Sequence, residues 1–299
     1  MNPERGNGGG DGAARPPGEL WTVQRVLTWT ANKFAERDKQ PARLEAEVLL
    51  AHVLKMNRVS LYVNYERPLD PAELAAYREL VKRRLAGEPS AYLVGKQEFW
   101  ALPLAVDARV LVPRRDTETL VETALELLGN SGVVAPRILD IGTGSGAIAL
   151  ALAKTRPDAS VVATDVSADA LEVAQVNAAA LGLDDRVSFA EGDLAASASG
   201  PFNLVVSNPP YIRAGDLAGL MAEVRHEPRL ALDGGADGLA VYRRLIPVAA
   251  GLLAEGGALA LEIGAEQAAE VSALVSAAGL TAETRRDLAR LDRVVIGRK

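Results

Sequence analysis

The sequence predicts an α/β protein in which a small helical bundle precedes an open, mostly parallel β-sheet with helices on both faces. Apolar residues recur at helical spacing from Leu20 to about Gly87. Beyond Arg137, short β-branched runs alternate with helical segments. The 299 residues suffice for two domains, or for one large domain with an extension. We expect a leader at residues 1–19, a helical domain at 20–88, a hairpin linker at 89–115 and the sheet domain at 116–299.

Composition excludes several classes of protein. The chain has no Cys, so it has no disulfide, no thiolate nucleophile and no cysteine-ligated zinc, and its two histidines, His52 and His226, make a His-rich metal site implausible. A net charge of -6 argues against a protein that wraps duplex nucleic acid. No apolar stretch has the length of a membrane span or a signal peptide, so we expect a cytoplasmic protein. From the missing Cys and the scarce His, we expect an enzyme that contains no metal.

The first part of the chain is predicted to be a leader followed by three helices. Residues 1–19 are rich in glycine and proline, which predicts a disordered leader with no assigned function. Thr22 can cap the first helix, and Asp70-Pro71-Ala72-Glu73 has the N-cap, first-turn proline and acidic residue that open another. The apolar faces are Val23, Val26, Leu27, Thr30 and Phe34, then Leu44, Val48, Ala51 and Leu54, then Leu74, Tyr77, Val81 and Leu85. The opposite faces, with Lys82, Arg83 and Arg84, fit either solvated surface or a docking site.

The second part is predicted to alternate strands with helices. Residues 98–106 alternate in polarity as a strand does and predict a hairpin between the domains, and a helix is expected to begin near Asp116. In such open sheets, ligands bind outside the carboxyl ends of the strands. The expected strands are 138–141, 160–165, 186–189, 202–207, 257–263 and 293–296, and the expected helices are 147–154, one ending at 181, 242–253 and 266–278.

A glycine-rich turn, Gly142-Thr143-Gly144-Ser145-Gly146, lies between a predicted strand and a predicted helix. Missing side chains there let the backbone approach a ligand closely, although a plain tight turn would have the same pattern. The run Gly142-x-Gly144-x-x-Ala147 also satisfies the relaxed dinucleotide fingerprint. Asp140 at the strand end argues against a dinucleotide, because its carboxylate would repel a pyrophosphate and attract a positively charged amino-acid moiety.

Two more carboxylates follow the next predicted strands. Asp165 is placed to accept hydrogen bonds from both hydroxyls of a ribose. Asp193 could accept from the amino group of an adenine while Leu194 packs on its ring. A ligand with an ammonium, a sulfonium, a ribose and an adenine matches this acidic set of residues. The sequence therefore predicts S-adenosylmethionine as the cofactor.

The tetrapeptide Asn208-Pro209-Pro210-Tyr211 directly follows the strand expected at 202–207. Its prolines stop the sheet, and because they cannot donate hydrogen bonds, the carbonyls of Pro209 and Pro210 are expected to be free to accept. Together with the Asn208 carboxamide oxygen and the flat ring of Tyr211, these carbonyls predict a binding site for a planar NH2 group. The other interpretation is a rigid loop that contains Asn-Pro by chance.

These motifs give the chain a resemblance to the bacterial release factor glutamine methyltransferases, the HemK/PrmC family. The resemblance spans about residues 20–299, and Arg115 and His226 stand where the family usually has proline and an aromatic residue. The tetrapeptide is shared with amino-group methyltransferases of DNA, RNA and protein, whereas the segment around Arg114 is much more specific. The segments that carry it are Pro89-x-x-Tyr92-x-x-Gly95, Glu98-Phe99, Val110-Leu111-Val112-Pro113-Arg114, Asp116-Thr117-Glu118, Leu139 to Gly146, Ser207 to Ile212, Glu227-Pro228 and Asp237-Gly238-Leu239.

The resemblance implies a Rossmann-like class I S-adenosylmethionine-dependent methyltransferase. Its implied reaction methylates the side-chain amide nitrogen, N5, of the glutamine in the Gly-Gly-Gln motif of peptide chain release factors, which the helical domain would recognise. We expect a monomer that forms no stable complex with nucleic acid or membrane. An adenine-N6 or other nucleic-acid amino methyltransferase, and a non-catalytic cofactor-binding interaction protein, remain as alternatives.

The residues support this reaction type independently. Asn208 Oδ1 and the Pro209 carbonyl are expected to bind the two N–H groups of an amide and direct its lone pair at the methyl group. Tyr211 would pack against the amide plane. Leu111 and Val112 are expected to line the channel for the glutamine side chain.

Overall fold

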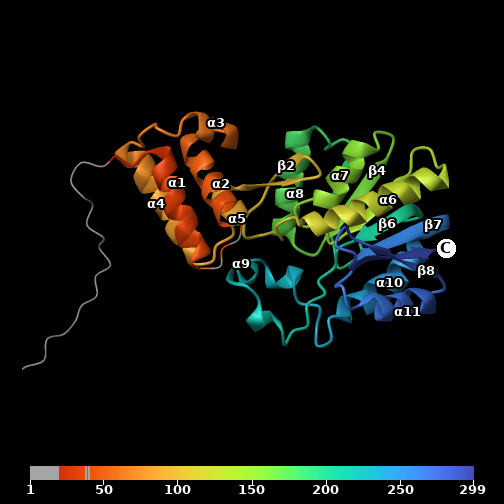
Figure 1. The fold of residues 1–299 in the computed structure, drawn as a ribbon. Coiled ribbons are helices and arrows are strands. Elements are labelled where there is room, and N and C mark those ends of the chain that lie inside the picture. Colours follow the sequence, from red (N-terminus) through yellow and green to blue (C-terminus); the bar gives the residue numbers. More distant parts are fainter. Residues whose placement is uncertain (1–19, 38, 40) are drawn as a thin grey trace, which may run out of the picture. The chain divides into compact units, whose positions relative to one another are not determined.

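The computed structural model describes residues 20–37, 39 and 41–299. The chain divides into two compact units, an N-terminal unit that ends at Leu85 and a C-terminal unit from Ala86 to Lys299 (Figure 1). The leader expected at residues 1–19 lies outside the described residues. None of the helices in the described ranges combines the length and apolar character that crossing a bilayer requires.

The N-terminal unit is helical, as the periodicity predicts. Thr22 caps the first helix by accepting from the Arg25 N–H, and Asp70 and Glu73 form the expected capping box, in which each side chain accepts from the other residue's N–H at 2.8 and 3.0 Å. A short helix capped by Asn57 was not predicted, because six residues are too few to show a helical period. The helices are α1 (Val23–Ala35), α2 (Ala42–Leu54), α3 (Arg58–Val63) and α4 (Pro71–Leu85).

The C-terminal unit contains a seven-stranded sheet in the order β5-β4-β3-β6-β7-β9-β8. The neighbouring strands from β5 to β7 pair in parallel, and β9 is antiparallel to both β7 and β8. A separate antiparallel pair, β1 (Lys96–Phe99) and β2 (Leu102–Ala105), forms the expected hairpin. The sheet strands are β3 (Arg137–Ile141), β4 (Ser160–Asp165), β5 (Val187–Glu191), β6 (Phe202–Ser207), β7 (Leu253–Glu262), β8 (Thr281–Arg286) and β9 (Asp292–Arg298).

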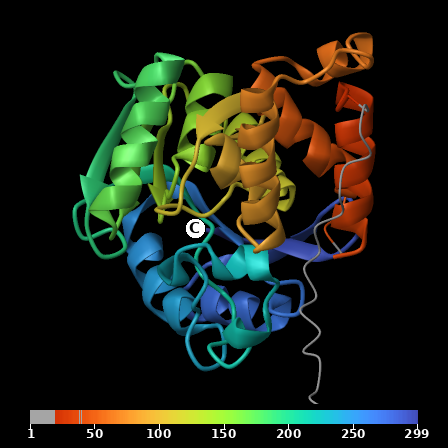
Figure 2. The same cartoon turned by 90° about the vertical axis from the view of Figure 1, so that its left-hand side faces the viewer.

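Helices cover both faces of this sheet, as Figures 1 and 2 show. Alternate strand residues serve the two faces: Ile138 packs in the core with α6 and α7, and Leu139 packs in the core with α10 and α11. Both side chains are fully buried. The helices of this unit are α5 (Ser90–Val94), η1 (Arg115–Thr117), α6 (Glu118–Ser131), α7 (Ala147–Thr155), α8 (Ala168–Leu181), η2 (Leu217–Gly219), α9 (Ala222–Arg225), η3 (Arg229–Ala231), α10 (Ala240–Leu252) and α11 (Ala268–Ala277).

The topology places the loops after several strands at one edge of the sheet. Strand order reverses between β3 and β6, which is the switch point where open α/β sheets bind ligands. Ile141, at the end of β3, is level with Thr164 of β4 and Ser207 of β6. The glycine turn after Ile141 and the tetrapeptide after Ser207 therefore start side by side.

Candidate active site

A cavity of about 210 Å³ lies at this edge of the sheet, in the C-terminal unit. Its walls come from the ends of β3 to β6, from residues 109–111, and from α10. Several expected site residues line it together: Leu111, Gly142, Gly144, Asp165, Asp193, Leu194, Asn208, Pro209 and Pro210. The other expected site residues lie behind the wall: Val112, Asp140, Thr143, Ser145, Gly146 and Tyr211.

The glycine turn presents bare backbone to the cavity. Gly142 and Gly144 have φ angles of 73° and 55°, and a Cβ added to either would meet no atom within 4 Å. Positive φ explains why glycine is favoured there, and the open space lets a ligand approach the backbone. Gly146 differs, because its Cβ would lie 3.1 Å from Leu150 and 3.3 Å from Ala174. It is a packing glycine between α7 and α8 rather than part of the wall.

Asp165 both shapes the turn and faces the cavity. Its Oδ2 accepts from the Gly144 N–H at 2.9 Å, and its Oδ1 accepts from the Ser167 N–H at 3.0 Å. Each carboxylate oxygen has further lone-pair capacity. The side chain can therefore hold the turn in place and still accept hydrogen bonds from a ligand.

Asp140, which we expected at the strand end beside the glycine turn in contact with the cofactor, does not line the cavity. Strand alternation turns it beneath the glycine turn, where it is fully buried and accepts from the Thr143 hydroxyl at 2.7 Å and the Ala149 N–H at 3.2 Å. Burial raises the pKa of this carboxyl to about 7. Its Oδ1 has no hydrogen-bond partner within the described residues. Contact with an ammonium group stays a prediction for that oxygen.

Asp193 and Leu194 lie together in the wall after β5. The Asp193 carboxylate forms an exposed ion pair with Arg244 of α10, a partner that the sequence did not reveal. The Leu194 carbonyl accepts from the Thr164 hydroxyl at 2.8 Å, which fixes the backbone beside the end of β4. Their contacts with an adenine stay predictions.

The tetrapeptide after β6 contributes part of the cavity wall. Asn208, Pro209 and Pro210 line it, while Asn208 Nδ2 donates to the Thr117 hydroxyl, at 3.3 Å, behind the wall. Among the described residues, no hydrogen bond reaches Asn208 Oδ1 or the carbonyl oxygens of Pro209 and Pro210. The amide therefore keeps its donor end in the protein and leaves its acceptor end for a ligand.

Tyr211 is not brought to the cavity, in contrast to the aromatic wall that we expected. Its ring lies against Gly264, and its carbonyl accepts from Gln267 Nε2 at 3.2 Å. Burial, with Glu262 nearby, raises the pKa of the phenol to about 12. Here Tyr211 anchors the tetrapeptide to the start of α11, and packing on a substrate amide stays a prediction.

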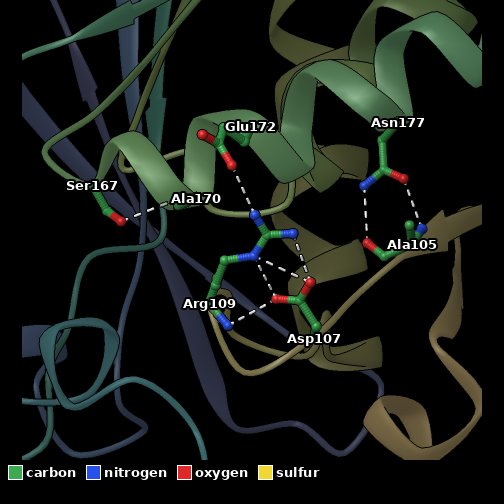
Figure 3. Close-up of polar contacts among 7 residues, drawn as sticks. All are labelled: Ala105, Asp107, Arg109, Ser167, Ala170, Glu172 and Asn177. Carbon is green, nitrogen blue, oxygen red and sulfur yellow. Dashed lines mark hydrogen bonds and ion pairs between the residues drawn. The ribbon is translucent and has the colours of Figure 1, made fainter.

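The end of β2 and the segment after it are held to α8 by polar contacts (Figure 3). Asn177 bonds both the N–H and the carbonyl of Ala105, at 2.6 and 3.0 Å. Arg109, which lines the cavity, pairs with Asp107 and with Glu172 of α8 at 2.8 and 2.9 Å. These contacts fix the position from which Leu111 reaches the wall.

A buried carboxylate fixes the next residues of this segment. Glu227 accepts from the Val112 N–H at 3.1 Å and forms an ion pair with Arg114. Val112 is buried behind Leu111, so Leu111 alone of the two expected channel residues lines the cavity. The Arg114 and Glu227 positions were noticed in the sequence only as family motifs.

The fold and the site together define a class I S-adenosylmethionine-dependent methyltransferase. The sequence matches the family descriptions "PrmC N-terminal domain" over residues 25–95 and "Methyltransferase small domain" over residues 117–226. It is 47% identical over 283 residues to the release factor glutamine methyltransferase of Geobacter sulfurreducens, covering 94% of this chain and 98% of the relative. It is 44% identical over 287 residues to that of Chlorobaculum tepidum, covering 93% and 97%. The chain belongs to the release factor glutamine methyltransferase family.

Among solved structures, the fold is similar to the hMettl16 catalytic domain in complex with MAT2A 3′UTR hairpin 6. That match has a TM-score of 0.57 and 16% identity, and it covers 78% of this chain and 93% of the other. At this identity the likeness concerns the fold alone.

Proposed function

We propose that the protein transfers a methyl group from S-adenosylmethionine to the side-chain amide nitrogen, N5, of the glutamine in the Gly-Gly-Gln motif of peptide chain release factors. The relatives at 44–47% identity carry the name release factor glutamine methyltransferase. One observation within the site supports the reaction most: Asn208, Pro209 and Pro210, whose acceptor oxygens have no hydrogen-bond partner among the described residues, line the same cavity as the open glycine turn.

The residues present fit the methyl donor. Gly142 and Gly144 leave a cradle that a Cβ would fill, and the Asp140 Oδ1 beneath it is a buried acceptor without a partner in the described part of the chain. We assign the ribose to Asp165 and the adenine to Asp193 and Leu194. When bound, S-adenosylmethionine supplies an electrophilic methyl group on a positively charged sulfur.

Asn208 and Pro209 act on the acceptor nitrogen. An amide nitrogen is a poor nucleophile because its lone pair is delocalised into the carbonyl. Two acceptor oxygens that bind its N–H groups orient the lone pair and favour the positive charge that develops on nitrogen. Orientation of this kind can supply about 7–11 kcal/mol of the barrier. No strong base need act before the attack, since the nitrogen loses its proton after transfer.

Leu111 lines the same cavity, and we assign it to the cover over the reacting groups. It stands on the segment that Glu227 and Asn177 hold in place. An apolar side chain there excludes water and strengthens the hydrogen bonds at Asn208. We also propose that the helical domain at residues 20–88 recognises the release factor, and that the protein acts as a cytoplasmic monomer without stable nucleic-acid binding.

The direct test offers two candidate methyl-accepting substrates in parallel. Purified protein is incubated with S-adenosylmethionine labelled in its methyl group, and either a release factor or double-stranded DNA is added. The proposal predicts label on the release factor, none on DNA, and none on a release factor whose motif glutamine is replaced by alanine. Label on DNA alone would favour the amino methyltransferase of nucleic acid. Cofactor binding without transfer to either would favour a non-catalytic binding protein.

A further inference from the structure

Glu262, the last residue of β7, lies beside Asn208 although nothing in the sequence links the two. Ser207 of β6 is level with Leu261 of β7, and the strands are parallel, so the residues that follow them are neighbours. The Glu262 side chain is 1% exposed. It does not line the cavity.

Glu262 and Thr117 contact the donor end of the Asn208 amide. Asn208 Nδ2 donates to Thr117 Oγ1 at 3.3 Å. The Thr117 hydroxyl and the Asn208 amide both act to lower the pKa of the Glu262 carboxyl, which places both groups close to it. One carboxyl oxygen, Oε2, has no hydrogen-bond partner among the residues that the structure describes. On this side of Asn208, the Thr117 hydroxyl accepts from Nδ2, and the nearby Glu262 carboxylate can only accept when it is ionised.

An amide has a donor end and an acceptor end, and rotation by half a turn exchanges them. If Asn208 turned over, its Oδ1 would face the oxygens of Glu262, and its NH2 would face the substrate. The first contact pairs two acceptors, and the second pairs two donors. Both are unfavourable in a buried site.

We propose that Glu262 is a positioning residue that, through Thr117 and by direct contact, holds the Asn208 amide with its acceptor oxygen toward the substrate. This inference rests on the proposed function, because the orientation matters only if the acceptor binds a substrate NH2 group. It assigns a role to a buried carboxyl that otherwise costs stability. A glutamine of the same shape would be cheaper to bury but could present either end to Asn208.

If Glu262 positions Asn208, kcat should depend on pH through the ionisation of the Glu262 carboxyl. The ionised carboxyl can only accept, whereas the protonated form can also donate and so tolerates the reversed amide. Burial raises the pKa of Glu262 to about 7, and Thr117 and Arg293 oppose that shift. The other titratable groups that face it are Asp116, Tyr211 and Tyr242. We expect kcat to rise as the pH increases through about 7 in the wild-type protein.

The test compares Glu262→Gln with wild type, using a release factor as substrate. The expected result is a kcat about 10- to 100-fold lower, with the dissociation constant for S-adenosylmethionine changed less than about twofold. The rise of kcat near neutral pH should disappear in the variant. The exposed carboxyl of Glu266, four residues further on, provides the control, because Glu266→Gln should leave kcat and its pH profile unchanged.

A second pair of variants tests the role of Thr117 between Glu262 and Asn208. Thr117→Val keeps the shape and removes the hydroxyl, so it should lower kcat, and Thr117→Ser should restore most of it. An unchanged kcat and pH profile in Glu262→Gln would overturn the inference. A lower kcat would also overturn the inference if cofactor affinity fell by a similar factor and the melting temperature fell with it, since that would indicate a merely structural role. If wild type itself methylates no glutamine, the proposed function fails, and this inference fails with it.

Discussion

The Asn208 side chain is bonded inside the protein and also belongs to the wall of the cavity. Its Nδ2 is bonded to Thr117 inside the protein, while the residue lines the cavity together with two prolines whose carbonyls are unpaired in the described structure. Unmade hydrogen bonds at a partly buried position are costly unless a ligand completes them. This arrangement therefore indicates a site prepared for a group that donates.

Replacing Asn208 by alanine should lower kcat about 100- to 1,000-fold, because one of the two acceptors that orient the substrate amide is lost. Affinity for S-adenosylmethionine should change less than about threefold. Release factor methylation measured by mass spectrometry gives kcat, and titration calorimetry gives the affinity. Equal turnover in the variant and wild type would remove Asn208 from the mechanism.

Asp165→Ala should weaken binding of S-adenosylmethionine about 10- to 100-fold, because the variant loses a charged acceptor and the bond that holds Gly144. Titration calorimetry measures this directly. The neighbouring Glu191 is exposed, is level with Asp165 and does not line the cavity, so Glu191→Ala provides the control. An unaltered dissociation constant in Asp165→Ala would refute the ribose assignment.

At the scale of elements, the loop between β6 and α10 is fixed to the tetrapeptide by a close backbone contact. Gly238 has a φ of 78°, and a Cβ added there would lie 2.5 Å from the Tyr211 carbonyl oxygen and 2.7 Å from Gln267 Nε2. Gln267 also donates to the carbonyls of both Tyr211 and Gly238. The position of the tetrapeptide therefore depends on a glycine far along the chain.

Gly238→Ala should lower the free energy of unfolding by at least about 2 kcal/mol and also reduce kcat, since it displaces Tyr211 and the acceptors before it. Gly215 lies in the same loop, and a Cβ there meets nothing within 4 Å, so Gly215→Ala should change stability by less than about 1 kcal/mol. Thermal unfolding and turnover of the two variants can be compared directly. If both alanines behave alike, the contact at Tyr211 does not constrain the site.

The elements that the sequence predicted well are the buried ones. The strands expected at 160–165 and 202–207 have the bounds of β4 and β6, because their β-branched residues are buried and their ends are marked by polar residues or proline. Strand β8 was missed, since none of its residues is fully buried and its charged side chains show no strand pattern. The short helices α9 and η3 were missed because a few residues carry no helical period.

The site was predictable where residues adjoin a strand end and unpredictable where separate segments meet. The glycine turn, Asp165 and Asn208 follow from their positions after parallel strands. The proximity of Glu262 to Thr117 and Asn208 depends on the strand order and on the start of α6, which no local pattern reveals. Asp140 was expected beside the glycine turn because of its strand-end position, whereas its burial depends on the direction of the side chain, which the sequence does not give.

At the scale of the whole C-terminal unit, two buried carboxyls couple stability to pH. Burial raises the pKa of both Asp140 and Glu262 to about 7 from ordinary values near 4. A group with a raised pKa in the folded state contributes stability that is present below its unfolded pKa and is lost as the pH rises through the folded value. We expect the cofactor-free protein to become less stable between pH 5 and about pH 8.

This prediction can be measured by urea denaturation at pH 5 and pH 8. Replacing Trp21 and Trp29 by phenylalanine leaves Trp100 to report on the C-terminal unit. Glu262→Gln should reduce the difference between the two pH values by about 1–3 kcal/mol, because one pKa unit corresponds to about 1.4 kcal/mol. The same difference in the variant and the parent would show that Glu262 does not carry the effect.

The proposed reaction adds one methyl group to a single atom of the substrate, the side-chain amide nitrogen of the motif glutamine. Fragmentation mass spectrometry of a release factor, after incubation with the protein and S-adenosylmethionine, locates any added methyl group. We predict one methyl on the side chain of the Gly-Gly-Gln glutamine, and none when the Asn208→Ala protein is used for the same short time. A methyl at any other residue, or none with the wild-type protein, would contradict it.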